Sequence, residues 1–320
     1  MSVRQPFPMS FTAKPKKISK ETVKRVQELL EQKQYIPSMA GILLAQNNSR
    51  IVGVAVHDHE KYEGRVLTDP FIASALNDLC VELEKAGYFL MVKVTREWKE
   101  ISRFASMWNM EGMVIIGFCE QDYVSLRDNM RIPFIVYDGY LKEAKRLCNL
   151  VVDHYDGGRQ MGMFFREMGH ERVLCISDND TCMDEERFLG FRDAMGEYGA
   201  DFMLIPMERE ERREFYRNRL QEIQSYSAVF AVSDYYAVDL MQFLQENAIR
   251  VPEDISVAGF DDSPLCRFIH PMLTTIKQDG HRRARLAVRL LQEMKEQRES
   301  GRNITLPVEL VKRNSVKHIL

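Results

Sequence analysis

The chain has 320 residues, of which 45% are hydrophobic and 28% are charged, which is ordinary for a folded protein with room for two domains. No apolar run is long enough to cross a bilayer, and the N-terminal residues lack the apolar stretch of a secretory signal, so we expect a cytoplasmic protein without membrane contact. Six cysteines without a CxxC pair favour reduced thiols over disulfides or zinc ligands.

Charge divides the chain into a basic head and an acidic body. Residues 1–50 carry nine Lys or Arg against three Glu, whereas the remainder carries 35 against 44 Asp or Glu. A basic head favours contact with an anionic partner, and nucleic acid is the leading candidate. A solvated basic arm is the alternative on charge alone.

The head is predicted to contain one helix, from Ile18 to Tyr35. Ser19 is a suitable N-cap, and apolar residues repeat on one face of the segment. Pro37 ends the segment, and a short apolar piece over residues 38–45 precedes a polar linker. We therefore expect residues 1–49 to form a small helical module at the head of the chain, and residues 50–320 to form the core.

From Arg50 onward, short apolar runs alternate with amphipathic segments, a pattern typical of βα units around parallel sheets. The pattern restarts after Asn149, which predicts an α/β fold with two doubly wound lobes behind the short helical headpiece. The helix expected over Arg282–Glu299 would return the chain to the first lobe, and Leu306–Val311 would add a final strand. The expected lobe bounds are 50–149 with 280–302, and 150–279 with 303–320.

The segment VAGFDDSPLCRFIHPMLTTIKQD, residues 257–279, joins an apolar strand to two carboxylates and a polar loop. Gly259 allows close backbone approach, and Asp261 and Asp262 fall where a buried strand would end. Ligands bind at the carboxyl edge of open parallel sheets, so this segment predicts a ligand site.

Six segments follow one another along the chain: ISKETVKRVQELLEQKQYIPSMAG, DHYDGGRQMG, MGHERVLCIS, RFLGFRDAM, AVSDYYAVDLM and VPEDISVAGFDD. In sequence and order they resemble the motifs of the lactose repressor and galactose repressor (LacI/GalR) family of bacterial transcription regulators. The resemblance implies a core like that of periplasmic binding proteins, a small-molecule effector, a DNA operator as partner, and a homodimer.

The resemblance also implies effector contacts, at Asp156, Arg187, Asp234, Asp261 and Gln278. Carboxylates and a guanidinium can bind the vicinal hydroxyls of a sugar or the edge of a base through charge-assisted hydrogen bonds. Phe71 and Tyr235 are candidate aromatic covers. The structural alternatives are a turn role for Asp156 and surface pairing of Arg187 with Asp184 or Glu186.

The head departs from the family pattern. Only seventeen residues precede Ile18, and Pro6 and Pro8 would fall inside the recognition helix, where a proline costs about 3 kcal/mol. We expect a truncated or degenerate helix-turn-helix, with Ser10, Lys14, Lys17 and Leu44 as candidate DNA contacts. Leu44 matches the hinge residue that wedges into the minor groove, and packing between domains is the alternative.

Other chemistry is weakly supported. The His57–Glu60 cluster lacks a third ligand at metal-site spacing, so a loop facing the ligand cleft is favoured over a metal site. The sequence contains no GxSxG elbow, phosphate loop or HExxH helix, and we predict no cofactor and no enzyme activity. The leading hypothesis is a ligand-responsive repressor that senses a small polar molecule, preferably a carbohydrate. A cytoplasmic sugar-binding module without DNA binding is the alternative.

Overall fold

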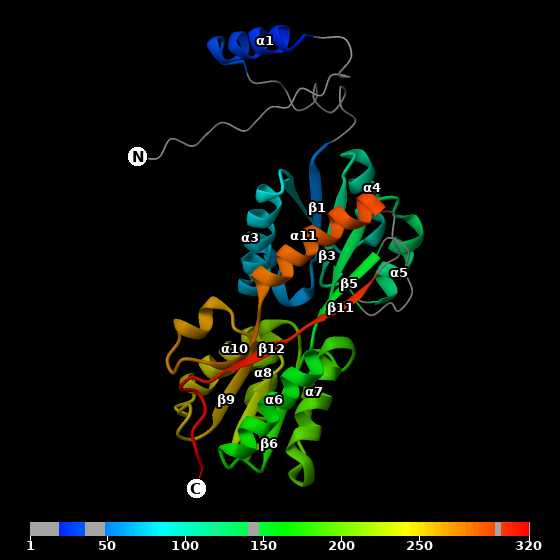
Figure 1. Ribbon diagram of the computed structural model, residues 1–320. Coiled ribbons are helices and arrows are strands. Elements are labelled where there is room, and N and C mark those ends of the chain that lie inside the picture. Colours follow the sequence, from blue (N-terminus) through cyan, green and yellow to red (C-terminus); the bar gives the residue numbers. More distant parts are fainter. Residues whose placement is uncertain (1–18, 36–48, 119, 140–146, 298–301, 320) are drawn as a thin grey trace. The chain divides into compact units, whose positions relative to one another are not determined.

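The computed structural model describes residues 19–35, 49–118, 120–139, 147–297 and 302–319. The chain divides into two compact units, residues 1–50 and 51–320. Figure 1 shows the chain, with many of its helices and strands labelled. Within the described residues, no helix is both long and apolar enough to span a membrane.

The described part of the first unit contains the helix α1 (Lys20–Gln32). The Ser19 side chain accepts a hydrogen bond from the Thr22 backbone amide at 3.1 Å, and so satisfies an amide that the first helical turn leaves free. The helix predicted in the head is therefore confirmed, with Ser19 as its N-cap. The candidate DNA contacts and the sequence features that surround them lie outside the described residues: Pro6, Pro8, Ser10, Lys14, Lys17 and the hinge residue Leu44.

The described residues of the second unit form two six-stranded sheets, one in each lobe. The first sheet has the order β11-β5-β4-β3-β1-β2, and the second has the order β12-β10-β9-β8-β6-β7. The pairings are parallel except that between β10 and β12, which is antiparallel. The strands are β1 (Ile51–His57), β2 (Phe89–Thr95), β3 (Gly112–Ile116), β4 (Phe134–Tyr137), β5 (Leu147–Val152), β6 (Val173–Ser177), β7 (Asp201–Leu204), β8 (Ala228–Ala231), β9 (Ser256–Asp261), β10 (Thr274–Gln278), β11 (Asn303–Leu306) and β12 (Val308–Val311).

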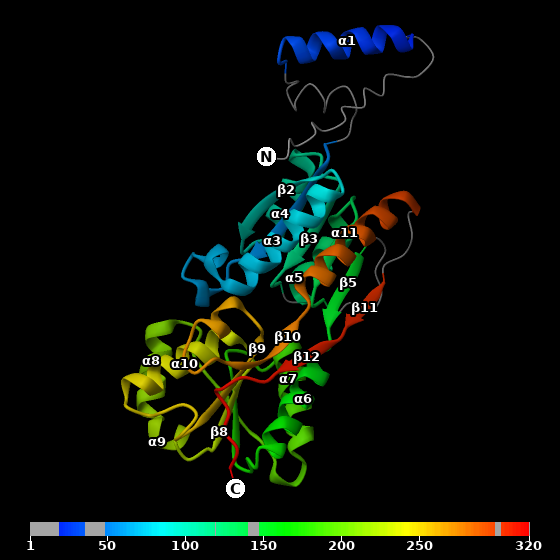
Figure 2. The same ribbon diagram turned by 60° about the vertical axis from the view of Figure 1, so that its left-hand side comes forward.

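Helices follow most strands, as the alternating sequence pattern predicts. The α-helices of the second unit are α3 (Pro70–Lys85), α4 (Trp98–Met107), α5 (Glu120–Asn129), α6 (His154–Glu167), α7 (Cys182–Met195), α8 (Arg209–Asn218), α9 (Leu220–Ile223), α10 (Asp234–Glu246) and α11 (Gly280–Gln297). Short 3₁₀ turns are η1 (Glu60–Tyr62), η2 (Val66–Thr68), η3 (Gly196–Tyr198) and η4 (Pro264–Arg267). The helix predicted near Arg282 is α11, which packs on α3 and on β3, β4 and β5 (Figure 2).

Strand β1 shows why helices cover both faces of the first sheet. Val54 and Val56 belong to the large buried cluster that also contains Leu79 of α3. Ala55 points to the opposite face and joins a second cluster with Ile101 of α4. Because successive side chains of a strand alternate between faces, a continuous apolar run requires helical cover on both sides. The predicted doubly wound α/β architecture is confirmed.

The chain passes between the lobes at three places: after β5, after β10 and between β11 and β12. The final strand predicted over Leu306–Val311 is confirmed for residues 308–311, but Leu306 ends a separate strand. Residues 303–306 pair with β5 in the first lobe, and residues 308–311 pair with β10 in the second. Pro307 separates the two strands, and proline has no amide hydrogen for a sheet ladder.

Candidate ligand-binding site

A cavity of about 160 Å³ lies between the two lobes. Its walls include residues at or just after the carboxyl ends of strands in both sheets, among them Ile116 at the end of β3, Asp138 after β4 and Asp261 at the end of β9. Parallel strands leave side chains of several chain segments together at this edge. The fold thus places the strongest sequence signature, the end of the VAGFDD strand, in a cavity wall.

Arg187 is the central cation of the second-lobe wall. Its side chain is buried, and its guanidinium lies 3.9 Å from the centre of the Phe260 ring. The Nη1 group donates to the Val232 carbonyl oxygen at 2.5 Å, and the Nε group donates to Nδ1 of His154 at 3.1 Å. Arg187 does contact Asp184, at 3.5 Å, as the structural alternative expects. The contact is buried at the cavity wall, however, and not on the helix surface.

Two glycines allow α7 to bring Arg187 to this position. A Cβ atom on Gly158 would lie 1.9 Å from the Arg187 carbonyl oxygen, and one on Gly190 would lie 1.9 Å from the Tyr155 carbonyl oxygen. The backbones of α6 and α7 therefore touch directly at this crossing. This close packing explains why glycine occupies position 158 in the motif DHYDGGRQMG and position 190 in the motif RFLGFRDAM.

Asp234 holds together the loop beneath the cavity. Its carboxylate accepts hydrogen bonds from the Ser263 amide at 2.7 Å, the Thr275 hydroxyl at 2.6 Å and the Cys266 thiol at 3.0 Å. Burial raises the pKa of Asp234 to about 6, although these three bonds favour the charged form. A Cβ atom on Gly259 would lie 2.4 Å from this carboxylate, which confirms the close approach expected at that glycine.

Asp261 and Gln278 form a pair at the ends of two neighbouring strands. The Gln278 amide nitrogen donates to the Asp261 carboxylate at 2.6 Å. Asp261 has a φ of 124°, a backbone conformation that is uncommon for residues other than glycine. Burial and repulsion from Asp234 and Asp69 raise its pKa well above the ordinary value, while Arg187 acts in the opposite direction.

Asp138 was not among the residues predicted from the sequence, although it directly follows the apolar run PFIVY. It lies 2.9 Å from Nε2 of His154 and 2.8 Å from the Arg283 guanidinium. Burial alone would raise its pKa, but Arg283 and His154 hold that pKa far below the usual range. The carboxylate thus joins the end of β4 to the starts of α6 and α11, next to two passages between the lobes. A strand-end carboxylate is the signal that could have identified it.

Lys61 connects the lobes, and no sequence motif pointed to it. Its ammonium lies 3.9 Å from Asp178 of the second lobe and 5.5 Å from the centre of the Tyr236 ring. Burial opposes its charge, but Tyr62, Asp178 and Asp184 raise its pKa. Lys61 lies on a 3₁₀ turn without periodic sequence pattern, so only the presence of a positive charge after a strand could have signalled it.

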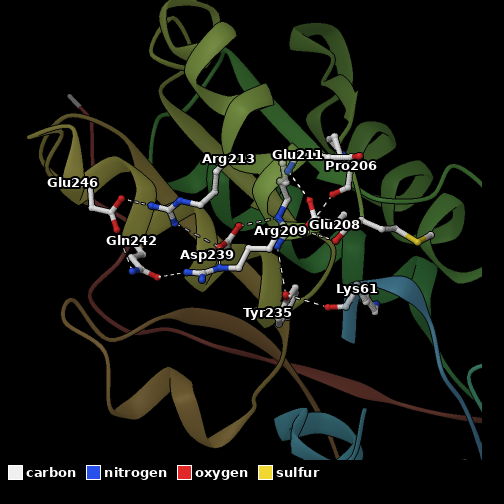
Figure 3. A network of polar contacts seen from close by, with 12 residues as sticks. Lys61, Pro206, Glu208, Arg209, Glu211, Arg213, Tyr235, Asp239, Gln242 and Glu246 are labelled. Atoms are coloured by element: carbon white, nitrogen blue, oxygen red, sulfur yellow. Dashed lines mark hydrogen bonds and ion pairs between the residues drawn. The ribbon is translucent and has the colours of Figure 1, made fainter. Parts of the chain in front are cut away.

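Tyr235 connects this turn to a polar network in the second lobe (Figure 3). Its hydroxyl donates to the Lys61 carbonyl oxygen at 3.3 Å and accepts from Arg212 at 3.4 Å. Arg212 is fully buried and pairs with Asp239 at 2.8 Å. The buried Arg212, which is held by Asp239, therefore helps to hold the Tyr235 ring at the cavity wall.

The structure brings together six of the seven predicted effector contacts. The cavity-lining residues among them are Phe71, Arg187, Asp234, Tyr235, Asp261 and Gln278. Asp156 is not among the lining residues. It lies in the first turn of α6, where it accepts hydrogen bonds from Arg159 at 2.8 Å and Gln160 at 2.7 Å. Its neighbour Asp153, rather than Asp156, provides the N-cap of that helix.

Of the His57–Glu60 cluster, His59 lines the cavity. Nε2 of His59 is 2.7 Å from the Gly117 carbonyl oxygen, and burial lowers the pKa of His59 to about 4. In the parts of the chain that the structure describes, no group of three or more His, Cys, Asp or Glu side chains is placed to hold a metal ion.

Comparisons with known proteins agree with this architecture. Residues 163–316 match the family model of the periplasmic binding protein-like domain. The HTH-type transcriptional repressor PurR of Aliivibrio fischeri is 27% identical over 320 residues, covering 95% of this chain and 92% of that protein.

Two solved structures share the fold. The lac repressor dimer bound to operator and the anti-inducer ONPF has a TM-score of 0.78 at 21% identity, covering 94% of this chain and 91% of the other. A LacI family transcriptional regulator from Enterococcus faecium with bound ribose has a TM-score of 0.73 at 21% identity, covering 84% of this chain and all of the other (100%). These comparisons show that the chain has the fold of the LacI family regulators and is similar over nearly its whole length to a PurR repressor.

Proposed function

We propose that this chain is a homodimeric transcription repressor that binds an operator and responds to a small polar molecule, a carbohydrate, held between its lobes. The observation that carries the proposal is the cavity between two parallel-sheet lobes, lined by Arg187, Asp261 and Gln278. Relatives support it: a PurR repressor matches nearly the whole chain, and a regulator of the same fold was solved with ribose. Such a regulator works in the cytoplasm and catalyses no reaction.

In this proposal the ligand contacts divide by chemistry. The Asp261 carboxylate and the Arg187 guanidinium bind hydroxyls, and Phe71 and Tyr235 cover the apolar face of the ring. Asp234 already accepts three hydrogen bonds, so it shapes the wall through the loop that it holds. Asp156 does not line the cavity, so in this proposal it affects ligand binding only through the helix α6 that carries it.

Binding between lobes provides a route to DNA. A ligand that contacts both lobes stabilises their closed arrangement, and closure changes the spacing of the two headpieces in a dimer. Such a coupling is typically worth about 1–3 kcal/mol. Residues 1–49 would form the headpiece and hinge, with Ser10, Lys14, Lys17 and Leu44 as DNA contacts.

The test is fluorescence anisotropy of the full-length chain with a library of labelled palindromic duplexes at low and moderate salt. We expect sequence-specific binding that weakens as salt rises, because phosphate contacts release counterions. Lys14→Ala and Lys17→Ala should weaken binding, whereas Lys99→Ala, on α4 of the core, should not. Weak binding that is indifferent to sequence would contradict the proposal.

That contrary result would favour the second candidate, a sugar-binding module without DNA function. One sequence feature supports this alternative: Pro6 and Pro8 fall where the recognition helix would lie. Binding of a sugar without specific DNA binding would distinguish it from the repressor.

A further inference from the structure

The cavity carries more negative charge than its cations can balance. Six aspartates line it: Asp69, Asp138, Asp178, Asp184, Asp234 and Asp261. Within the described residues, three of them have an ion-pair partner, since Asp138 pairs with Arg283, Asp178 with Lys61 and Asp184 with Arg187. No described Lys, Arg or His lies within ion-pair distance of Asp69, Asp234 or Asp261.

Two of the unbalanced carboxylates act on the third, Asp261, from opposite lobes. Asp69 belongs to the first lobe, where it caps α3 through the Ile72 amide at 3.0 Å. Asp234 and Asp261 belong to the second lobe, and both Asp69 and Asp234 repel the charge of Asp261. Lys61 partly offsets the charge of Asp69, and Arg187 partly offsets that of Asp261. Both cations are already paired, Lys61 with Asp178 and Arg187 with Asp184. A buried carboxylate such as Asp261, whose negative charge is disfavoured by two nearby carboxylates and which has no described cation within ion-pair distance, favours binding of a cation.

A bare metal ion does not fit this arrangement. No group of three potential ligands within the described ranges stands close enough together to coordinate one metal. A larger cation can contact carboxylates on opposite walls, and the remaining lining groups suit hydroxyls and the face of a ring. Gln278 presents an amide, and Phe71 and Tyr235 present aromatic surfaces.

We propose that the ligand of this cavity is a polyhydroxylated molecule with a protonated amine, an amino sugar, whose ammonium group lies between Asp69 and Asp261. This inference rests on the proposed function and narrows its ligand class. The ammonium would bridge the lobes, because Asp69 is on one and Asp261 is on the other. Ligand charge would therefore drive closure directly, and sugar phosphates and uronic acids would be excluded.

The test compares the melting temperature of the full-length protein with paired probes. D-glucosamine, D-galactosamine and D-mannosamine are each measured beside their N-acetyl derivatives and parent sugars, with glucose 6-phosphate as the anion. We expect at least one amine, at about 10 mM and with a millimolar dissociation constant, to raise Tm by about 3 °C. Its N-acetyl partner, which has the same ring without the charge, should produce no shift.

Two conservative variants locate the charge. Asn is as good an N-cap as Asp and tolerates a positive φ, so Asp69→Asn and Asp261→Asn preserve the backbone while removing one charge each. Each should weaken binding of the amine by about tenfold. Asp193→Asn, exposed on α7, is the matched control and should leave the affinity unchanged.

The outcomes separate this inference from the proposed function. Stabilisation by a neutral sugar at least equal to that by its amine would overturn the ammonium site but keep a sugar-responsive regulator. The absence of a shift with every amine would also overturn the ammonium site. Operator binding, measured separately by anisotropy, decides the regulatory proposal in either case.

Discussion

The Tyr235 hydroxyl in the second lobe donates a hydrogen bond to the Lys61 carbonyl oxygen in the first lobe, 3.3 Å away. The same hydroxyl accepts from the buried Arg212, so the contact between the lobes is continuous with a charged network inside the second lobe. A residue that lines the ligand cavity therefore also holds the lobes together.

Removing this hydroxyl should loosen the first-lobe turn. Tyr235→Phe keeps the ring but loses a hydrogen bond worth about 1 kcal/mol, so we expect amide hydrogen exchange in Glu60–Tyr62 to accelerate about fivefold. Tyr226→Phe is the control, because the Tyr226 hydroxyl bonds to Asp201 within the second lobe. Equal exchange in both variants would show that the contact does not restrain the turn.

Asp184 should make stability depend on pH. Burial raises its pKa to about 6 against an ordinary value of 3.8, although Arg187 opposes the shift. The folded state therefore holds the proton more tightly than the unfolded state. The stabilising contribution is complete below the unfolded pKa and is lost as pH rises through about 6, a difference of about 3 kcal/mol.

The variant Asp184→Asn isolates this contribution. Its free energy of unfolding should rise relative to that of the unsubstituted protein between about pH 4 and pH 7, as measured by urea denaturation at stepped pH. The exposed Asp180→Asn should show no such trend. Parallel pH profiles for Asp184→Asn and the unsubstituted protein would rule out a raised pKa.

The Asp138–Arg283 pair should be costly to break from one side. Both side chains are buried, and Arg283→Met would leave the carboxylate without its closest cation at a cost of about 3–5 kcal/mol. Adding Asp138→Asn should recover part of that loss, which urea denaturation of the two single variants and the double variant would reveal. A double variant as unstable as the sum of the single losses would show that the two charges are not coupled.

Gly158→Ala should destabilise the protein, although alanine normally stabilises a helix relative to glycine. The new methyl group would meet the Arg187 carbonyl oxygen, and separating α6 from α7 should cost about 2–3 kcal/mol. Because the displaced segment carries Arg187, ligand affinity should fall as well. An unchanged or higher Tm would mean that the two helices can separate freely.

The architecture could be predicted because its signals are local. The apolar runs around Val54 and Val114 must be covered on both faces, and that requirement already implies helices between parallel strands. The last strand could not be divided correctly, because Leu306 and Val308 have the same apolar character. Only pairing with β5 or β10 assigns each of them to its lobe.

The site was predictable where residues lie at strand ends or in ordered motifs, as Asp261 and Arg187 do. Lys61 meets Asp178 and Asp184 only after the lobes come together, and it is more than a hundred residues from either aspartate in the sequence, so no periodic signal links them. Asp156 shows the reverse case. Its place in a family motif predicts a ligand contact, but its side chain pairs with Arg159 and Gln160 on its own helix.

The three passages of the chain between the lobes also set an order for biosynthesis. The first lobe obtains α11 and the edge strand β11 only after the strands β6–β10 of the second have been translated. Leu79 belongs to the same buried cluster as Ala287 of α11, which is more than two hundred residues away and is therefore synthesised much later. A nascent first lobe exposes part of its apolar core throughout this interval, so this N-terminal lobe completes its folding after most of its neighbour has been made.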